Sequence, residues 1–257
     1  MQTHELKKYS NITYHVVSMP NVWQEKTLLL SKVSEALNPN QEKNHIGAGG
    51  TFEDILKAQS NVSFLMSAGF NHYRKNFYNW QHTNFNEGDP VGLVKIRQHL
   101  YVDQLNPEQY GYFVQKDKQK PWEILKKVSS PLNYKYILGC TPLIIFNNQQ
   151  MDLSSIKDTP VSPGEINPPS YLGHKDQTHP RALVGIKENA LVFIVVEHPG
   201  CSLGELQALA VKEELSHAIN LDGGGSAKFM LKTKEGAWIK RDRKSTRLNS
   251  SHGYISY

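Results

Sequence analysis

Two strand-like runs joined by two residues constrain the fold of this chain more than any other feature. Residues 181–187 and 190–196 are rich in apolar and β-branched side chains, and the two residues between them have the length of a tight hairpin turn. Paired positions across such a loop sum to 377, so Arg181 is predicted to face Val196. This segment therefore predicts an antiparallel β-hairpin with an apolar interior.

A helix and a further strand follow this hairpin. Ser202 and Glu205 match the S-x-x-E capping box that opens a helix, and residues 206–215 continue with an apolar stripe at helical spacing. Residues 218–221 return to a strand pattern. Strand, helix and strand in this order predict a right-handed crossover between parallel strands. The expected fold class is α+β: a mixed, twisted β-sheet with few helices, in which the hairpin precedes a β-α-β crossover near the C-terminus.

Four polar signals are expected at one edge of that sheet. Glu197 ends one strand, and Asp222 ends its predicted parallel neighbour. His179 and Arg181 lie at the start of the antiparallel partner, so they are expected at the same edge. The stretch Gly223–Ser226 follows directly, and backbone without side chains can approach a ligand closely and present N–H groups to an anion. We therefore expect a ligand-binding site at this edge.

The rest of the chain is predicted to hold short strands and two short helices. The strands are expected over residues 12–18, 27–33, 62–66, 91–96, 100–104, 110–115 and 137–146. The helices are expected over residues 52–59 and 121–128. Residues 71–89 are polar and aromatic without a helical or alternating period. A loop of that length inside a compact domain is usually functional or mobile.

Composition excludes several classes of protein. The longest uncharged apolar run, residues 190–196, is too short to cross a bilayer. The formal charge is +5, but five of the 29 basic residues lie within residues 240–247, so the preceding chain is close to neutral and no nucleic-acid partner is expected. Two cysteines cannot form a disulfide framework or a four-cysteine zinc site. The first ten residues lack the apolar core of a signal peptide, which makes the cytoplasm the default location.

The segment Asn220–Ser226 (NLDGGGS), preceded by the helix and by His179-Pro180-Arg181, resembles the phosphodiester glycosidase family. Earlier pieces match that family in type and order: the strand with His15, the helix before Val62, the Ala68-Gly69-Phe70 turn, Pro90-Val91-Gly92 and Pro142-Leu143-Ile144. The likeness covers residues 12–231. It implies one domain over residues 1–240 that hydrolyses a glycosyl-1-phosphodiester, with an N-acetylglucosamine-like sugar among the candidates. Family members are often exported.

This chain departs from the family pattern at three places. Ser67 stands where the family usually has Asn, Asn71 replaces a Phe, and Glu197-His198-Pro199 replaces Asp-Gly-Arg. A second interpretation is therefore a non-catalytic module that binds a carbohydrate or glycophosphate. Residues 241–257 are expected to be a non-native or disordered tail that follows a shortened domain, because residues 244–257 resemble translated sequencing-adapter sequence.

The resemblance and the chemistry together suggest a role for each candidate. Arg181 would hold the phosphate, because a guanidinium matches phosphate oxygens, and the amides of Gly223, Gly224 and Gly225 would assist. Asp222 would stabilise a cationic anomeric carbon or act as nucleophile or base. His179 would donate or relay a proton. The remaining members of the predicted catalytic and substrate-binding set are Glu197, Gly69, Asn71 and Ser226.

Each role has a structural alternative. Asp222 can form an Asx-type turn with the glycines, Arg181 can form a salt bridge with Glu197, and His179 can shape the turn before a proline. Glu197 can simply be solvated, and Asn71 can lie in an ordinary surface loop. No cofactor is expected, although a divalent cation at Asp222 or Glu197 that bridges to phosphate is left open. The expected partner is a sugar phosphodiester or phosphoglycan substrate, and the sequence leaves the oligomeric state open.

Overall fold

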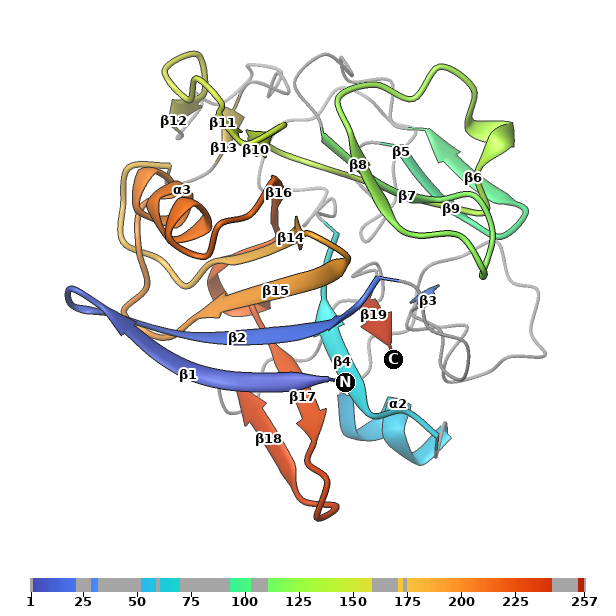
Figure 1. The fold of residues 1–257 in the computed structure, drawn as a ribbon, viewed down its shortest axis with the longest axis horizontal. Helices are drawn as coiled ribbons and strands as arrows, with labels where there is room; N and C mark the ends of the chain where they lie inside the picture. Colours follow the sequence, from blue (N-terminus) through green and yellow to red (C-terminus); the bar gives the residue numbers. More distant parts are fainter. Residues whose placement is uncertain are drawn as a thin grey trace, which may run out of the picture.

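The computed structural model describes residues 2–21, 29–31, 52–58, 61–69, 93–102, 111–158, 171–172, 175–241 and 254–256. Its centre is a seven-stranded sheet (Figure 1). In spatial order the strands are β1 (Thr3–Tyr9), β2 (Ile12–Pro20), β15 (Ala190–Val196), β14 (Ala182–Lys187), β16 (His217–Leu221), β10 (Leu143–Phe146) and β11 (Gln149–Gln150). Every pairing between these strands is antiparallel.

Two five-stranded sheets and a short parallel pair complete the strands that the structure describes. One sheet has the order β18 (Trp238–Arg241), β17 (Phe229–Lys232), β4 (Phe64–Ser67), β19 (Tyr254–Ser256) and β3 (Leu29–Ser31). The other has the order β6 (His99–Val102), β5 (Leu93–Ile96), β9 (Tyr136–Cys140), β7 (Gly111–Gln115) and β8 (Glu123–Leu125). The parallel pair is β12 (Lys157–Asp158) and β13 (Tyr171–Leu172). The helical elements are α2 (Phe52–Ala58), α3 (Leu203–Lys212) and the 3₁₀ turns η2 (Pro131–Asn133) and η3 (Gly224–Ser226).

The central sheet is buried on both faces. Side chains alternate between the faces of a strand, so Phe193 and Val195 of β15 pack against the two smaller sheets, whereas Ile194 and Val196 pack under α3. Figure 1 shows α3 lying beside β14 and β15. Burial of both faces explains why β15 is an unbroken apolar run instead of an alternating one.

The capping box predicted for α3 is present. The Ser202 side chain accepts a hydrogen bond from the Glu205 N–H at 3.2 Å, and the Glu205 carboxylate accepts one from the Ser202 N–H at 2.7 Å. Leu206 and Leu209 of the predicted stripe are buried against the sheet.

The hairpin prediction is confirmed, and the prediction of a mixed sheet is wrong. Ala182 pairs with Val195, and the Val196 N–H donates to the Arg181 carbonyl at 2.8 Å, as the expected register requires. Ala182 also pairs with Leu221 of β16, so β14 lies between β15 and β16. The strands joined by α3, β15 and β16, do run parallel, but β14, the first strand of the hairpin, separates them, and they are not neighbours.

Other elements differ locally from expectation. The helix predicted over residues 121–128 is β8, because Ile124 is buried and pairs with Phe113 of β7. The strand predicted over residues 137–146 is two strands, β9 and β10, separated by Thr141-Pro142. Polar β1 was not expected. Residues 254–256, within the predicted tail, form β19 and pair with β3 and β4.

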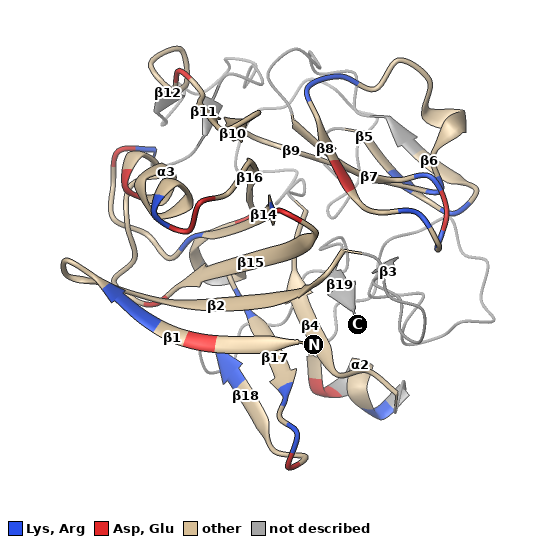
Figure 2. Ribbon diagram, in the orientation of Figure 1, with Lys and Arg blue, Asp and Glu red and all other residues tan. Residues whose placement is uncertain are grey.

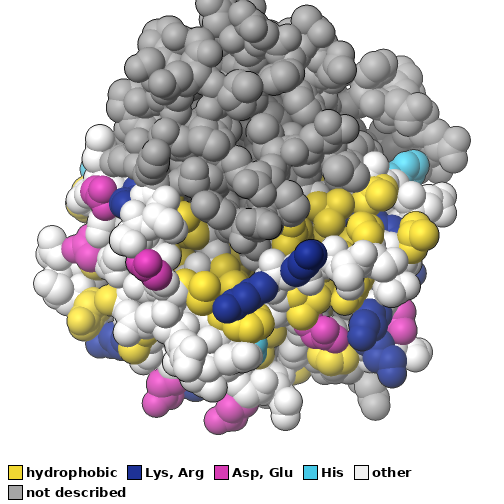
Figure 3. Space-filling model, turned by 90° about the horizontal axis from the view of Figure 1, so that it is seen from above, with side chains coloured by type: hydrophobic (Ala, Val, Ile, Leu, Met, Phe, Trp, Pro, Cys, Tyr) yellow, Lys and Arg dark blue, Asp and Glu magenta, His cyan; other side chains and the backbone are white. Residues whose placement is uncertain are grey.

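The described surface shows little segregation of charge. On the described part of the face in Figure 3, basic and acidic side chains are interspersed with hydrophobic ones. Neither α2 nor α3, the two α-helices in the described residues, is long and apolar enough to span a bilayer.

Candidate active site

Three segments that are far apart in the sequence meet at one edge of the central sheet. They are the end of β4, the residues before β14 and the residues after β16. The Asp222 N–H donates to the Ala68 carbonyl at 3.0 Å, and the Gly224 N–H donates to the Pro180 carbonyl at 2.7 Å. The pairing of β14 with β16 ends at Ala182 and Leu221, which are the chain neighbours of Arg181 and Asp222. The predicted meeting of these segments is therefore seen in the backbone.

Two glycines allow this close approach. A Cβ on Gly223 would lie 3.0 Å from the Pro180 carbonyl oxygen. Gly200 has a φ of +108°, and a Cβ there would lie 1.8 Å from the carbonyl carbon of His179. His179 and Cys201 exchange backbone hydrogen bonds of 2.9 and 3.2 Å beside this glycine. Any other residue at Gly200 would push His179 away from this bridge.

Asp222 is half-buried and is oriented by the glycine turn. Its Oδ1 accepts the Gly223 N–H at 2.9 Å, which is the Asx-type contact that the sequence left open. The pKa of the Cys140 thiol is raised, first by complete burial and then by the negative charge of Asp222. The negative charge of Asp222 therefore acts on the buried thiol of Cys140.

Arg181 is buried, with only 4% of its surface exposed. Its Nε donates to the Cys201 carbonyl at 3.0 Å, and its Nη2 lies 3.3 Å from the carbonyl oxygens of both Lys175 and Gln177. The guanidinium therefore fixes the segment before β14 to the start of α3. These backbone contacts hold its positive charge in place.

The amides of the glycine turn are mostly engaged within the protein. Those of Gly223 and Gly224 donate to Asp222 and Pro180, and that of Ser226 donates to the Gly223 carbonyl at 3.0 Å. Two of the three glycine amides expected to bind an anion are therefore engaged within the protein.

Ser67 has a structural position. It is fully buried, its hydroxyl donates to the Ser226 carbonyl, and it accepts the Lys228 N–H at 3.1 Å. The backbone N–H of Ser67 also donates to the Lys228 carbonyl at 3.1 Å. Ser67 thus ties the glycine turn to β4. The departure from the family's Asn is a packing feature here.

The other predicted residues have varied positions. His179 is half-buried, and its Nε2 lies 3.4 Å from Gln177 Oε1. Gly69 follows β4 closely, and a Cβ there would lie 3.1 Å from Leu138 Cδ1. Asn71 lies outside the described residues.

Glu197 belongs to a different cluster. Its Oε1 lies 2.6 Å from His15 Nε2, and its Oε2 lies 3.5 Å from Arg241 Nε. By strand alternation Glu197 is on the face of Val195, which packs against the smaller sheets, whereas Arg181 is on the face covered by α3. Glu197 ends its strand at the expected edge, but its carboxylate and the Arg181 guanidinium lie on opposite faces.

The cluster around Glu197 includes residues that the sequence did not identify as site residues. His15 Nδ1 lies 2.9 Å from His4 Nε2, and the His15 ring meets the Phe229 ring edge-on with 4.8 Å between centroids. Burial, followed by the nearby His15, lowers the pKa of His4. Linear spacing carries no signal for this cluster, because its members come from β1, β2, β17, β18 and the end of β15. Within the described part of the chain, no group of three His, Cys, Asp or Glu side chains is placed to hold a metal ion.

Comparison with solved structures shows the same fold at low sequence identity. A putative exported protein from Burkholderia pseudomallei K96243 has a TM-score of 0.65 and 11% identity, over 95% of this chain and 73% of that one. A hypothetical protein from Synechocystis has a TM-score of 0.59 and 12% identity, over 100% of this chain and 62% of that one. The third is the zebrafish N-acetylglucosamine-1-phosphodiester alpha-N-acetylglucosaminidase catalytic domain, auto-inhibited by pro-peptide. It has a TM-score of 0.55 and 15% identity, over 100% of this chain and 80% of that one.

The sequence comparisons give one positive result. No curated protein sequence matches the chain. The sequence model of the phosphodiester glycosidase family matches residues 67–252, which include the end of β4, the residues before β14 and the glycine turn after β16. That match spans well over half of the chain, and the chain belongs to the phosphodiester glycosidase family.

Proposed function

We propose that this protein hydrolyses a glycosyl-1-phosphodiester at the edge formed by β4, β14 and β16. The bond between the anomeric carbon and the phosphate oxygen breaks, water supplies a hydroxyl group to that carbon, and a phosphomonoester leaves. The observation that carries the proposal is the position of Asp222, which is held by the Ala68 carbonyl and the Gly223 amide and directly follows the strand paired with β14, which Arg181 precedes.

Asp222 is the residue proposed to act on the sugar. A departing phosphate leaves behind an anomeric carbon with oxocarbenium character, and an adjacent carboxylate stabilises that positive charge. The Gly223 N–H occupies Oδ1 and so fixes the plane of the carboxyl group. A carboxylate already held in one orientation loses little freedom when the transition state forms.

Arg181 and Gly225 are proposed to favour the phosphate. The guanidinium supplies positive charge at the edge, and its contacts with carbonyl groups keep that charge in place. The Gly225 amide adds a donor from bare backbone. Because a phosphate leaves as a stable anion, His179 need contribute only a modest proton transfer. Glu197 takes a structural role in this proposal, through its contacts with His15 and Arg241.

The sugar to test first is N-acetylglucosamine, which appears in the name of the zebrafish structural neighbour. A suitable substrate is the 4-nitrophenyl phosphodiester of N-acetylglucosamine 1-phosphate. Cleavage at the anomeric carbon releases 4-nitrophenyl phosphate, which becomes coloured only after a phosphatase is added. Cleavage of the other ester bond releases coloured nitrophenol at once. In oxygen-18 water, the proposed reaction leaves the phosphate unlabelled.

Asp222→Asn is the central variant, and Asp152→Asn is its matched control. Asp152 is exposed and also accepts a backbone N–H, from Ser154 at 2.8 Å. The first change should lower kcat/KM by roughly 10²–10⁴-fold, whereas the second should leave it unchanged. Full turnover by the Asp222→Asn variant would refute the role assigned to this carboxylate.

A glycophosphate-binding module is the second candidate. It is favoured by one observation: of the two carboxylates predicted to act at this edge, Glu197 turns to the opposite face, whereas glycoside hydrolysis commonly uses a carboxylate pair. Calorimetric binding of the same phosphodiester without release of sugar, with binding retained in Asp222→Asn, would support the module and exclude the hydrolase.

A further inference from the structure

Strand β1 is the end strand of the central sheet. It pairs over its whole length with β2, from Thr3 with Ser18 to Tyr9 with Ile12, and no other described strand pairs with it. Figures 1 and 2 show β1 along the margin of the sheet, with an acidic position in its middle and basic positions toward the turn into β2. An unpaired strand edge is a template for pairing with another strand.

The outward peptide groups of β1 follow from the hairpin. The pair that closes a two-residue loop exchanges both hydrogen bonds, and bonded pairs then alternate with unbonded ones. Independently, the Thr13 carbonyl accepts the Glu197 N–H at 2.8 Å, so Thr13 faces β15 and its partner Lys8 does not bond to β2. Both arguments place the N–H and C=O groups of His4, Leu6 and Lys8 at the outer edge of the sheet.

The sequence of this edge complements itself in the antiparallel direction. If Leu6 faces Leu6 of a second copy, Glu5 faces Lys7 of that copy and Lys7 faces its Glu5. The outward N–H and C=O groups can form hydrogen bonds in the same register, because His4 then faces Lys8 of the second copy. Two opposite-charge pairs and one apolar pair therefore arise from a single alignment.

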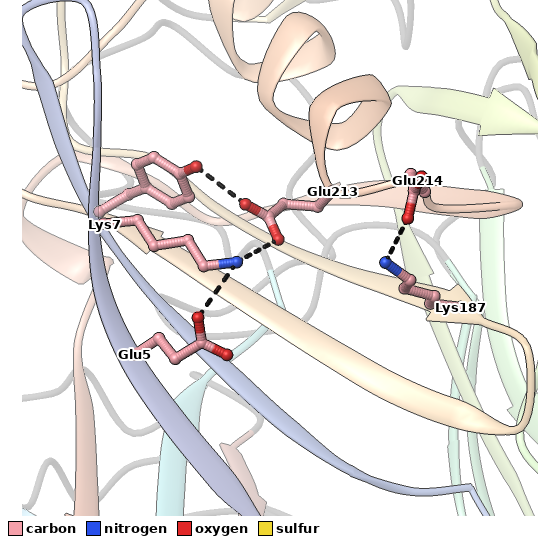
Figure 4. A network of polar contacts seen from close by, with 6 residues as sticks. Glu5, Lys7, Lys187, Glu213 and Glu214 are labelled. Carbon is pink, nitrogen blue, oxygen red and sulfur yellow. Dashed lines mark hydrogen bonds and ion pairs between the residues drawn. The ribbon is translucent and has the colours of Figure 1, made fainter.

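Lysines on an edge strand ordinarily discourage such pairing. Here Lys7 already lies between two acids, 3.4 Å from Glu5 and 2.7 Å from Glu213 (Figure 4). Glu213 is held in turn by the Tyr14 hydroxyl at 2.8 Å. A further carboxylate from a second copy would join an ordered ammonium group. On the other face, 62% of the Leu6 surface is exposed and open to apolar contact.

We propose that two copies of this protein associate through β1, in antiparallel register about a two-fold axis at Leu6, and join their central sheets into one. A single strand pair is a small interface, so the dimer is weak, with a dissociation constant of roughly 10–100 μM.

Register-specific crosslinking tests the geometry directly. In Leu6→Cys the two Cα atoms would be about 5.5 Å apart, within the span of a disulfide. In Thr3→Cys the two would be about 20 Å apart, because position 3 faces position 9 of the other copy. The native Cys140 and Cys201 are both buried and supply little background. Mild oxidation should crosslink Leu6→Cys alone. Equal crosslinking of both variants, or of neither, would overturn the register.

Sedimentation velocity from about 5 to about 500 μM, a range that brackets the expected affinity, tests association without any crosslink. Leu6→Lys places two ammonium groups face to face and should raise the dissociation constant about tenfold. Leu132→Lys is the control, because Leu132 is also exposed but lies in η2. A parent protein that stays monomeric at the highest concentration, or equal effects of the two lysines, would overturn the proposal.

Discussion

Removal of the Ser67 hydroxyl is expected to loosen the glycine turn. Ser67 is fully buried, and its hydroxyl is the partner of the Lys228 N–H and the Ser226 carbonyl. In Ser67→Ala the Lys228 N–H loses the acceptor that this hydroxyl provides.

The magnitude follows from that lost acceptor. A buried donor left without a partner costs about 1–3 kcal/mol, so we expect a loss of about 2 kcal/mol in the free energy of unfolding. The backbone pair from the Ser67 N–H to the Lys228 carbonyl is retained, which limits the effect to the side chain. For a chain of this size the loss corresponds to a fall in Tm of about 4–8 °C.

Urea unfolding, followed by tryptophan fluorescence and by circular dichroism, measures this loss. Ser130→Ala is the control, because Ser130 precedes η2 and makes no side-chain capping hydrogen bond. The control should change stability by less than about 0.5 kcal/mol. If Ser67→Ala unfolds within 0.5 kcal/mol of the parent and keeps the same m value, the hydroxyl does not hold the turn and the reasoning fails.

Three further predictions concern stability. The pKa of His4 in the folded protein is lowered from its ordinary value near 6.5, so the free energy of unfolding should be full above that pH and fall as the pH drops below it. His4→Gln should reduce this pH dependence in urea titrations. Part of it should persist, because burial also lowers the pKa of His217. Ser202→Ala should cost about 1 kcal/mol by loss of the α3 cap, measured by thermal unfolding. Gly200→Ala should prevent cooperative unfolding or cost more than about 3 kcal/mol, whereas Gly204→Ala, where a Cβ meets nothing within 4 Å, should be neutral or stabilising.

Local chemistry explains what could be predicted from the sequence. A two-residue loop sets the register of β14 with β15, and the Ser202–Glu205 box sets the start of α3. Both signals act between residues that are close in the chain. The edge that carries Asp222 followed from the same local elements, since strand ends are set by strand order and direction.

Long-range pairing explains the errors. β16 pairs with the free edge of β14 instead of with β15. That choice depends on which strand edges are free after the hairpin forms, and no short motif encodes it. β8 resembles a helix start in sequence but is a strand because Ile124 pairs with Phe113. Glu197 was placed at the correct edge, but strand alternation puts it on the face opposite Arg181, where its carboxylate contacts His15 of β2, which is distant in the chain.

The pairing of β2 with β15 also has a consequence for synthesis. β2 ends at Pro20 and its partner β15 begins at Ala190. About 170 further residues must therefore leave the ribosome before β2 can pair with β15, which takes roughly 10–30 s at ordinary elongation rates. During that time the apolar flank of the β1–β2 hairpin is uncovered. Yield in a heterologous host should therefore depend on holding chaperones and on growth temperature more than on the equilibrium stability of the finished molecule.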